Sequence, residues 1–147
     1  MTTIRRGELR DADAVFLLAK QFMQDGLRIN RDEFLVAFQN TIRPRQDETN
    51  VLYVAEDGDG AVIGYTLMTV SRLLHAPGLT AHLQELVVDE EARGRGLGSD
   101  LVRANETYAR HRGVRQLTMA TSRAGGFYER LGYRDVAVFY KKILDLG

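Results

Sequence analysis

The chain has 147 residues with 20 basic and 20 acidic side chains, so its formal net charge is zero. This balance argues against an extended nucleic-acid-binding or membrane-binding surface, and no apolar run approaches transmembrane length. The sequence contains no cysteine, which excludes disulfides, thiolate metal sites and cysteine nucleophiles. We therefore expect one domain over residues 1–147, working in the cytoplasm without nucleic-acid or membrane partners.

The N-terminal part of the chain predicts a strand followed by two helices. A short strand fits residues 3–6. Asp11 is a suitable N-cap for a first helix that is expected to end near Gly26. Asn30, followed three residues later by a glutamate, has the pattern of a capping box for a second helix over residues 31–42.

The middle of the chain predicts a hairpin and a further strand. Strands are expected over residues 51–55 and 61–70, because the sequence Asp-Gly-Asp-Gly at 57–60 is a strong turn signal between two apolar runs. An irregular stretch over 73–79 then leads into a strand over 80–88. These strands are expected to pair antiparallel.

The C-terminal part alternates helix and strand. A long helix is expected to begin at Leu97 and to end at Gly113, followed by a strand over 114–120. Ser122 can cap a last helix, and residues 133–144 are rich in strand-forming residues and predict a closing strand. The predicted order is β-α-α-β-β-β-α-β-α-β, which implies a mixed sheet with helices on both faces.

Residues 85–99 are the most informative stretch of the sequence. Leu86, Val87 and Val88 form an apolar run suited to a buried strand, and the chain then enters a glycine-rich loop that leads into a helix. Such a loop exposes backbone N–H groups at a helix N-terminus, which favours the binding of an anion. The candidate anion-binding residues are Arg93, Gly94, Arg95, Gly96, Leu97, Gly98 and Ser99.

This loop departs from the common nucleotide-binding motifs. It has the spacing G-x-G-x-G where a Rossmann loop needs G-x-G-x-x-G, and it has no P-loop lysine. Two alternatives remain open at this point: an ordinary turn with surface arginines, and a generic nucleotide-phosphate site. The pattern R-x-x-G-x-G, formed by Arg93, Gly96 and Gly98, resembles the pyrophosphate loop of the GCN5-related N-acetyltransferase (GNAT) family.

A second segment resembles the same family. Residues 124–133 read A-G-G-F-Y-E-R-L-G-Y, which is similar to the family segment A-x-x-F-Y-x-x-L-G-[FY], and the predicted order of elements also matches. The resemblance implies an α/β fold with a mixed, mostly antiparallel, twisted central sheet and helices on both faces. A weaker similarity, in residues 84–88, 92–94 and 98–99 and in the compact ending with Phe139, Lys141 and Leu144, points to the aminoalkylphosphonate N-acetyltransferase branch.

The resemblance implies transfer of an acetyl group from acetyl-CoA to a primary amine of a small molecule. Such a reaction needs a base that takes a proton from the amine and an acid that protonates the leaving thiolate. The resemblance makes Glu85 the base, directly or through a water molecule, and Tyr128 the acid. Strand alternation does not fix the face of Glu85, because family members usually have a β-bulge at this position.

The resemblance also assigns the contacts to acetyl-CoA. Backbone groups of Leu86, Val87 and Val88 would hold the pantetheine arm and the acetyl carbonyl, and the glycine-rich loop would hold the pyrophosphate. Phe127 lies in the second family segment, and Thr121 stands where many family members have asparagine. No metal is expected, since surface or turn positions are the commoner explanation for the histidines near this strand.

Three questions stay open in the sequence. The acceptor could also be a protein N-terminus or a lysine, and the domain could bind acetyl-CoA without catalysis, as a sensor or an interaction module. The segment over 133–144 is short for the two closing strands that are usual in the family, so that either the first is truncated or the end pairs with a second copy. This shortness and the family's habit together predict a homodimer.

Overall fold

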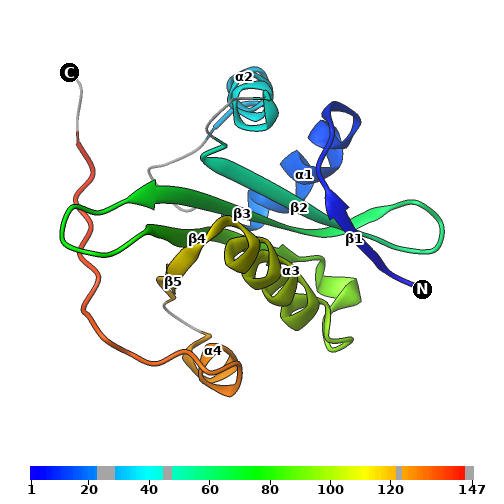
Figure 1. Ribbon diagram of the computed structural model, residues 1–147. Helices are drawn as coiled ribbons and strands as arrows, with labels where there is room; N and C mark the ends of the chain where they lie inside the picture. The colour runs from blue at the N-terminus through cyan, green and yellow to red at the C-terminus, as the bar shows by residue number, and fades with distance from the viewer. Residues whose placement is uncertain (23–28, 45–47, 122–123, 145–147) are drawn as a thin grey trace.

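Five strands form one sheet with helices on both of its faces (Figure 1). The computed structural model describes residues 1–22, 29–44, 48–121 and 124–144. The strands are β1 (Thr3–Arg6), β2 (Asn50–Glu56), β3 (Val62–Arg72), β4 (Leu79–Val88) and β5 (Val114–Met119). The helices are α1 (Ala12–Ala19), α2 (Arg31–Ile42), α3 (Leu97–Arg112) and α4 (Gly125–Arg130), with short 3-10 turns at Leu9–Asp11, Lys20–Phe22 and Glu90–Ala92.

The strands lie side by side in the order of the chain, β1-β2-β3-β4-β5. The first three pairs are antiparallel, and β4 pairs with β5 in parallel. A parallel pair needs a crossover, and α3 provides it by returning the chain to the other end of the sheet. The prediction of a mixed, mostly antiparallel sheet is therefore confirmed.

The two faces of the sheet bury separate apolar clusters. Helices α1 and α2 cover one face, and α3 covers the other (Figure 1). The cluster under α1 and α2 includes Leu18, Phe38, Leu52, Tyr65 and Val87. The main cluster on the α3 side includes Met68, Ala81, Leu83, Val102, Ala109 and Tyr128. A strand residue that belongs to one of these clusters points its side chain toward the helices on that face.

Local sequence signals account for the ends of the two longest helices. The capping box of α2 forms as predicted: Asn30 Oδ1 accepts a hydrogen bond from Glu33 N at 2.8 Å, and Glu33 Oε2 accepts one from Asn30 N at 3.4 Å. Helix α3 ends at Gly113, which adopts a left-handed φ of 80° that residues with a side chain rarely take.

A β-bulge interrupts the pairing of β3 with β4. Leu67 pairs with Glu85, whereas the next residue, Met68, pairs with Leu83, so that Gln84 is an extra residue in β4. An extra residue shifts the alternation of side chains by one position. The side chains of β4 after Gln84 therefore point to the face opposite to the one that regular alternation from Leu83 would give them.

The predicted closing strand is wrong for the isolated chain. Residues 133–144 follow α4 without entering a strand, and in Figure 1 this segment runs beside the body of the molecule as a separate trace. Its large apolar side chains face solvent, with Tyr140 87% and Val138 76% exposed. The described part of the chain gives this segment no partner strand, so its strand-forming residues do not form a strand.

Three predictions about helix ends need correction or lie outside the described residues. Asp11 is at the N-cap position of α1 but makes no cap hydrogen bond, because its carboxylate is engaged by Arg5 and by the Glu8 backbone. The predicted end near Gly26 and the proposed cap at Ser122 both lie outside the described residues. Just before α4, Thr121 Oγ1 accepts a hydrogen bond from Ala124 N at 2.9 Å.

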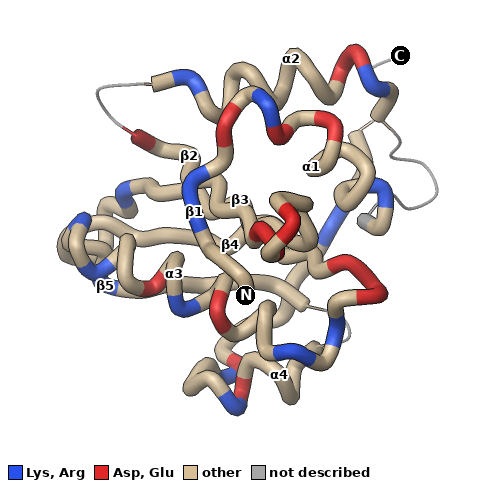
Figure 2. The backbone as a smooth tube through the Cα atoms, turned by 90° about the vertical axis from the view of Figure 1, so that its right-hand side faces the viewer, with Lys and Arg blue, Asp and Glu red and all other residues tan. Residues whose placement is uncertain are grey.

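No helix in the described ranges is both long and apolar enough to cross a bilayer. Basic and acidic positions are interspersed along the backbone, as the blue and red segments of Figure 2 show. The basic and acidic side chains are therefore not separated into a basic and an acidic part of the molecule.

An ion-pair network ties the start of the chain to the sheet. The Arg5 guanidinium donates to both oxygens of Asp11, at 2.8 and 2.9 Å, and to Glu56 Oε2 at 2.6 Å. Asp11 Oδ2 also accepts from Glu8 N at 2.7 Å, and only 4% of its side chain is exposed. Burial alone would raise the pKa of Asp11, but the hydrogen bonds from Arg5 and Glu8 outweigh it, so the pKa is lowered.

We expect Asp11→Asn to lower the free energy of unfolding by about 2 kcal/mol at pH 7, because the variant loses charge-assisted hydrogen bonds to Arg5. A carboxyl whose pKa is lower in the folded state stabilises the fold above its unfolded pKa, about 3.9, and loses this effect as the pH falls through the folded pKa. The difference between the two proteins should thus shrink below about pH 4 in urea titrations.

Asp13→Asn is the matched control. Asp13 pairs with Arg31 on the surface, where its side chain is 74% exposed. Its loss should change the free energy of unfolding by less than about 0.5 kcal/mol. Equal effects of the two substitutions would contradict the role given to Asp11.

Candidate active site

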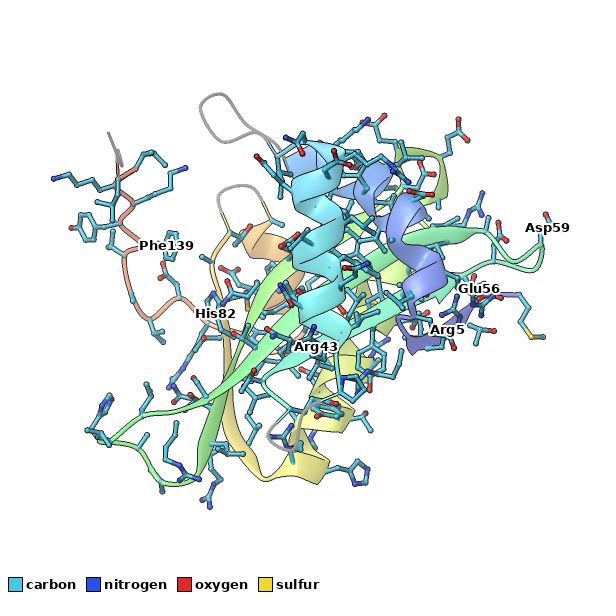
Figure 3. All side chains as sticks on the ribbon, turned by 90° about the horizontal axis from the view of Figure 1, so that it is seen from above. Arg5, Arg43, Glu56, Asp59, His82 and Phe139 are labelled. Atoms are coloured by element: carbon cyan, nitrogen blue, oxygen red, sulfur yellow. The ribbon has the colours of Figure 1, made fainter. Side chains whose placement is uncertain are left out.

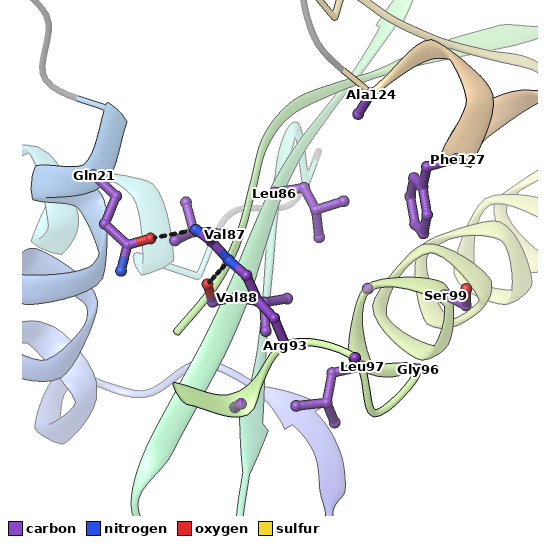
Figure 4. Close-up of a pocket in the computed structure, with 13 residues that line it drawn as sticks. Gln21, Leu86, Val87, Val88, Arg93, Gly96, Leu97, Ser99, Ala124 and Phe127 are labelled. Atoms are coloured by element: carbon purple, nitrogen blue, oxygen red, sulfur yellow. Dashed lines mark hydrogen bonds between the residues drawn. The ribbon is translucent and has the colours of Figure 1, made fainter. Parts of the chain in front are cut away.

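A cavity of about 630 Å³ lies between the end of β4, the glycine-rich loop, the N-terminus of α3 and the start of α4 (Figure 4). This volume is typical of sites for small molecules and cofactors. The lining residues are Gln21, Leu86, Val87, Val88, Ala92, Arg93, Gly94, Gly96, Leu97, Gly98, Ser99, Ala124 and Phe127. Ten of the twelve residues predicted to bind the cofactor thus line one cavity, and Arg95 and Thr121 are not among its lining residues.

The floor of this cavity is the N-terminal end of α3. The N-cap residue is Gly96, which provides no side-chain cap. The first internal hydrogen bond of the helix runs from Asp100 N to Gly96 O, so the backbone N–H groups before Asp100 take no part in the helix ladder. These groups and the helix dipole favour an anion at this end.

Glycine is required at two positions of the loop by the backbone itself. Gly94 and Gly96 have φ angles of 82° and 79°, in the left-handed region. A Cβ at either position would have no protein atom within 4 Å, so it would project into open space. At Gly98, by contrast, a Cβ would lie 3.2 Å from Phe127 Cζ, which shows how closely α3 approaches α4.

The two loop arginines, both predicted to bind the anion, make different contacts. Arg93 donates to Val88 O at 3.3 Å and to Gln21 Oε1 at 3.1 Å, across the mouth of the cavity (Figure 4). Arg95 donates to Glu91 O at 3.4 Å. Sequence reasoning missed Gln21, because it lies 72 positions from Arg93 and belongs to no motif.

Glu85 lies on the face of the sheet that α1 and α2 cover. Its Oε1 accepts a hydrogen bond of 2.6 Å from the hydroxyl of Tyr65, which is only 2% exposed and belongs to the cluster under these helices. Burial, with the carboxylate of Glu85 next to it, raises the pKa of Tyr65, so this phenol stays protonated and remains a donor. No sequence pattern predicts this pair, because the β-bulge decides the face on which Glu85 lies.

Tyr128 lies on the opposite face, in the cluster on the α3 side. It is 9% exposed and packs edge-to-face against Phe127 and Tyr133, with ring centroids 5.0 and 6.0 Å apart. Burial raises the pKa of Tyr128, so its hydroxyl carries a proton at neutral pH. Phe127, next to it in α4, lines the cavity, whereas Glu85 and Tyr128 themselves are outside the lining.

The residues present fit the diphosphate end of a coenzyme A ester. The cavity offers uncapped helix N–H groups for an anion and an apolar wall from β4 for an extended chain. For a metal the described ranges offer no group of three or more ligating side chains, and His82 Nδ1 is 2.8 Å from Thr118 Oγ1.

Comparison with known proteins agrees with this geometry. Residues 48–135 match the family model described as an acetyltransferase (GNAT) domain. The chain is 31% identical over 134 residues to glucosamine 6-phosphate N-acetyltransferase 1 of Oryza sativa, covering 88% of this chain and 79% of the relative. It is 27% identical over 145 residues to the aminoalkylphosphonate N-acetyltransferase of Salmonella typhimurium, covering 96% and 90%.

Solved structures of N-acetyltransferases share this fold. The crystal structure of glucosamine-6-phosphate N-acetyltransferase from Arabidopsis thaliana superposes with a TM-score of 0.83 over 99% of both chains, at 23% sequence identity. The family implies acetyl-CoA as the acyl donor. The cavity at the start of α3, the order of the strands and the matched family model agree, and the chain belongs to the GCN5-related N-acetyltransferase family of acyltransferases.

Proposed function

We propose that this protein transfers an acetyl group from acetyl-CoA to a primary amine of a small molecule. The observation that carries the proposal is the cavity in which the uncapped N-terminus of α3 meets the apolar end of β4. The relatives are named for N-acetylation of glucosamine 6-phosphate and of aminoalkylphosphonates, which are small amines. This favours a small acceptor over a protein N-terminus or a lysine side chain.

Two side chains supply the proton transfers of this proposal. Acetyl-CoA supplies an acyl group on a thiol leaving group. Glu85 takes the proton that the amine loses as its nitrogen bonds to the acyl carbon, directly or through a water molecule. Tyr65 fixes one oxygen of this carboxylate at 2.6 Å. Tyr128 gives its proton to the sulfur as the carbon–sulfur bond breaks, and its burial favours the protonated form that an acid needs.

Binding of the coenzyme is the first property to test. In titration calorimetry the wild-type protein should bind acetyl-CoA and CoA in the micromolar range and should not bind ATP. Gly96→Val should weaken acetyl-CoA binding at least about tenfold. Gly96 has a left-handed φ that valine strains, and a side chain there would project into the open space in which the coenzyme is proposed to bind. A folded wild-type sample that does not bind acetyl-CoA would remove the cofactor from this proposal.

Gly113→Val is a matched control for this substitution. Gly113 has a φ of 80°, and a Cβ there also meets no protein atom within 4 Å, but it lies at the opposite end of α3. Both variants should lose similar stability, since both strain a left-handed residue. Only Gly96→Val should lose affinity for acetyl-CoA, so equal losses of affinity would contradict the anion site at the loop.

The two proton-transfer roles predict opposite effects on the pH–rate profile. Glu85→Gln should lower kcat about a hundredfold and flatten the acid limb, because the amide cannot take a proton. Tyr128→Phe should lower kcat by a similar factor and flatten the alkaline limb, since the ring keeps its packing and loses only the proton donor. Calorimetry should find acetyl-CoA affinity unchanged in both. An acid limb that survives in Glu85→Gln would reject that base.

Coenzyme binding measured together with turnover of a panel of amines separates an enzyme from a sensor. A non-catalytic module that binds acetyl-CoA would show wild-type affinity for the coenzyme and no acetylation of any amine in a broad panel. Retention of both Glu85 and Tyr128 favours the enzyme, because a module without catalysis has no need of either.

We further propose that the protein is a cytoplasmic homodimer without nucleic-acid partners, built by the segment over 134–144. This segment carries a run of exposed apolar side chains, and β5 is an edge strand of the described sheet. A groove of about 320 Å³ between α3, β5 and the end of α4 includes Val114, Leu117 and Tyr133 in its lining. The segment of a second copy can pair with the free edge of β5 there, and this pairing would cover the exposed apolar side chains of the segment.

Sedimentation equilibrium should give twice the 16.6 kDa mass of the chain. A double substitution, Val138→Asp and Tyr140→Asp, should shift the protein to a monomer, because it places charges on the side chains that a partner would bury. Leu74→Asp is the control, since Leu74 is fully exposed in the loop between β3 and β4 and should not affect the mass. A monomeric wild-type protein would contradict the dimer.

A further inference from the structure

A group of polar side chains outside the cavity lies on the sheet face that α1 and α2 share. His82 of β4 stands between Ala81 and Leu83, which both pack in the cluster on the α3 side, so its side chain points to the opposite face. Thr118 of β5 and Thr69 of β3 are the strand partners of His82 and share this face. Figure 3, which looks onto this face, shows His82 on the sheet beside α2.

The hydrogen bonds of this group favour one tautomer of the His82 ring. Thr118 Oγ1 donates to Ala81 O at 3.3 Å, and a hydroxyl has only one proton to donate. In the arrangement in which Thr118 gives its proton to Ala81 O, its Oγ1 accepts from His82 Nδ1, which is 2.8 Å away. The ring then carries its proton on Nδ1 and keeps a lone pair on Nε2. Burial lowers the pKa of His82, which favours the same neutral ring.

The bulge brings this group to the side of Glu85. Residues three apart in a regular strand point to opposite faces, but the extra residue Gln84 places His82 and Glu85 on the same one. The two positions are about 10 Å apart along β4. Between them, Gln84 Nε2 donates to Thr69 Oγ1 at 3.0 Å, so this stretch of the face is polar. A small amine placed with its nitrogen at Glu85 can reach His82 with its other end.

We propose that His82, oriented by Thr118, binds the end of the acceptor that is remote from the amine, by accepting a hydrogen bond from a hydroxyl group at Nε2. The inference rests on the proposed function, because it takes Glu85 as the place of the amine. An Nε2 lone pair attracts an O–H group and offers nothing to an alkyl chain. The protein therefore selects amino alcohols over alkylamines of equal length.

The test compares two probes, 5-amino-1-pentanol and pentylamine, as acceptors for acetyl-CoA. The wild-type protein should have a KM about three- to tenfold lower for the amino alcohol, the range expected for one hydrogen bond. His82→Ala should raise the KM for the amino alcohol by this factor and leave that for pentylamine within about twofold. The affinity for acetyl-CoA should not change, because His82 does not line the cavity.

Three variants separate orientation of the ring from general damage. Thr118→Val removes the partner of Nδ1 and should lose most of the preference for the amino alcohol, whereas Thr118→Ser keeps the hydroxyl and should retain it. His75→Ala changes an exposed histidine of the loop before β4 and should leave both KM values as in the wild type. Nitrogen-15 NMR of the three histidines should assign the Nδ1-protonated tautomer to His82.

Each outcome bears on a separate claim. Turnover of both amines with equal KM in the wild type, or a preference that survives in His82→Ala, would overturn the subsite and leave the acetyltransferase proposal intact. An Nε2-protonated His82 in the NMR spectrum would overturn it without any measurement of turnover. Binding of acetyl-CoA with no acetylation of any amine in a broad panel would contradict the proposed function instead.

Discussion

The extra residue in β4 is the constraint on which the proposed chemistry depends. With Gln84 outside the regular pairing, Leu83 stays in the cluster on the α3 side while Glu85 reaches the hydroxyl of Tyr65 on the other face. A strand without the bulge would place one of the two on the wrong face, since side chains alternate strictly. Burial of Leu83 and exposure of Glu85 to an acceptor are compatible only through this irregularity.

The site joins two kinds of structure with separate physical origins. The proposed anion end comes from local backbone geometry, because Gly94 and Gly96 take left-handed φ angles and leave the start of α3 uncapped. The proposed proton-transfer end comes from burial on two faces of one sheet, with Glu85 held by Tyr65 and Tyr128 packed between Phe127 and Tyr133. The sheet therefore holds the proposed base and acid on opposite faces, and the coenzyme cavity opens at the end of β4.

The closing segment shows where a sequence pattern needs a partner to take effect. Residues 133–144 have the composition of a strand, yet they leave α4 without pairing in the described chain. Strand formation requires hydrogen bonds from a neighbouring strand, whereas a helix makes its own. This difference explains why the predicted helix over 31–42 matches α2 while the predicted last strand does not form in the single chain.

The sequence by itself determined the order of elements through α4, the capping box of α2, the glycine-rich loop before α3 and the family segment around Tyr128, because each depends on residues close together in the chain. Only the tertiary structure decided the face of Glu85, its bond to Tyr65, the reach of Arg93 to Gln21 and the pairing of His82 with Thr118. These contacts join residues 20 to 72 positions apart, and their geometry follows from strand register and helix packing, which no local pattern encodes.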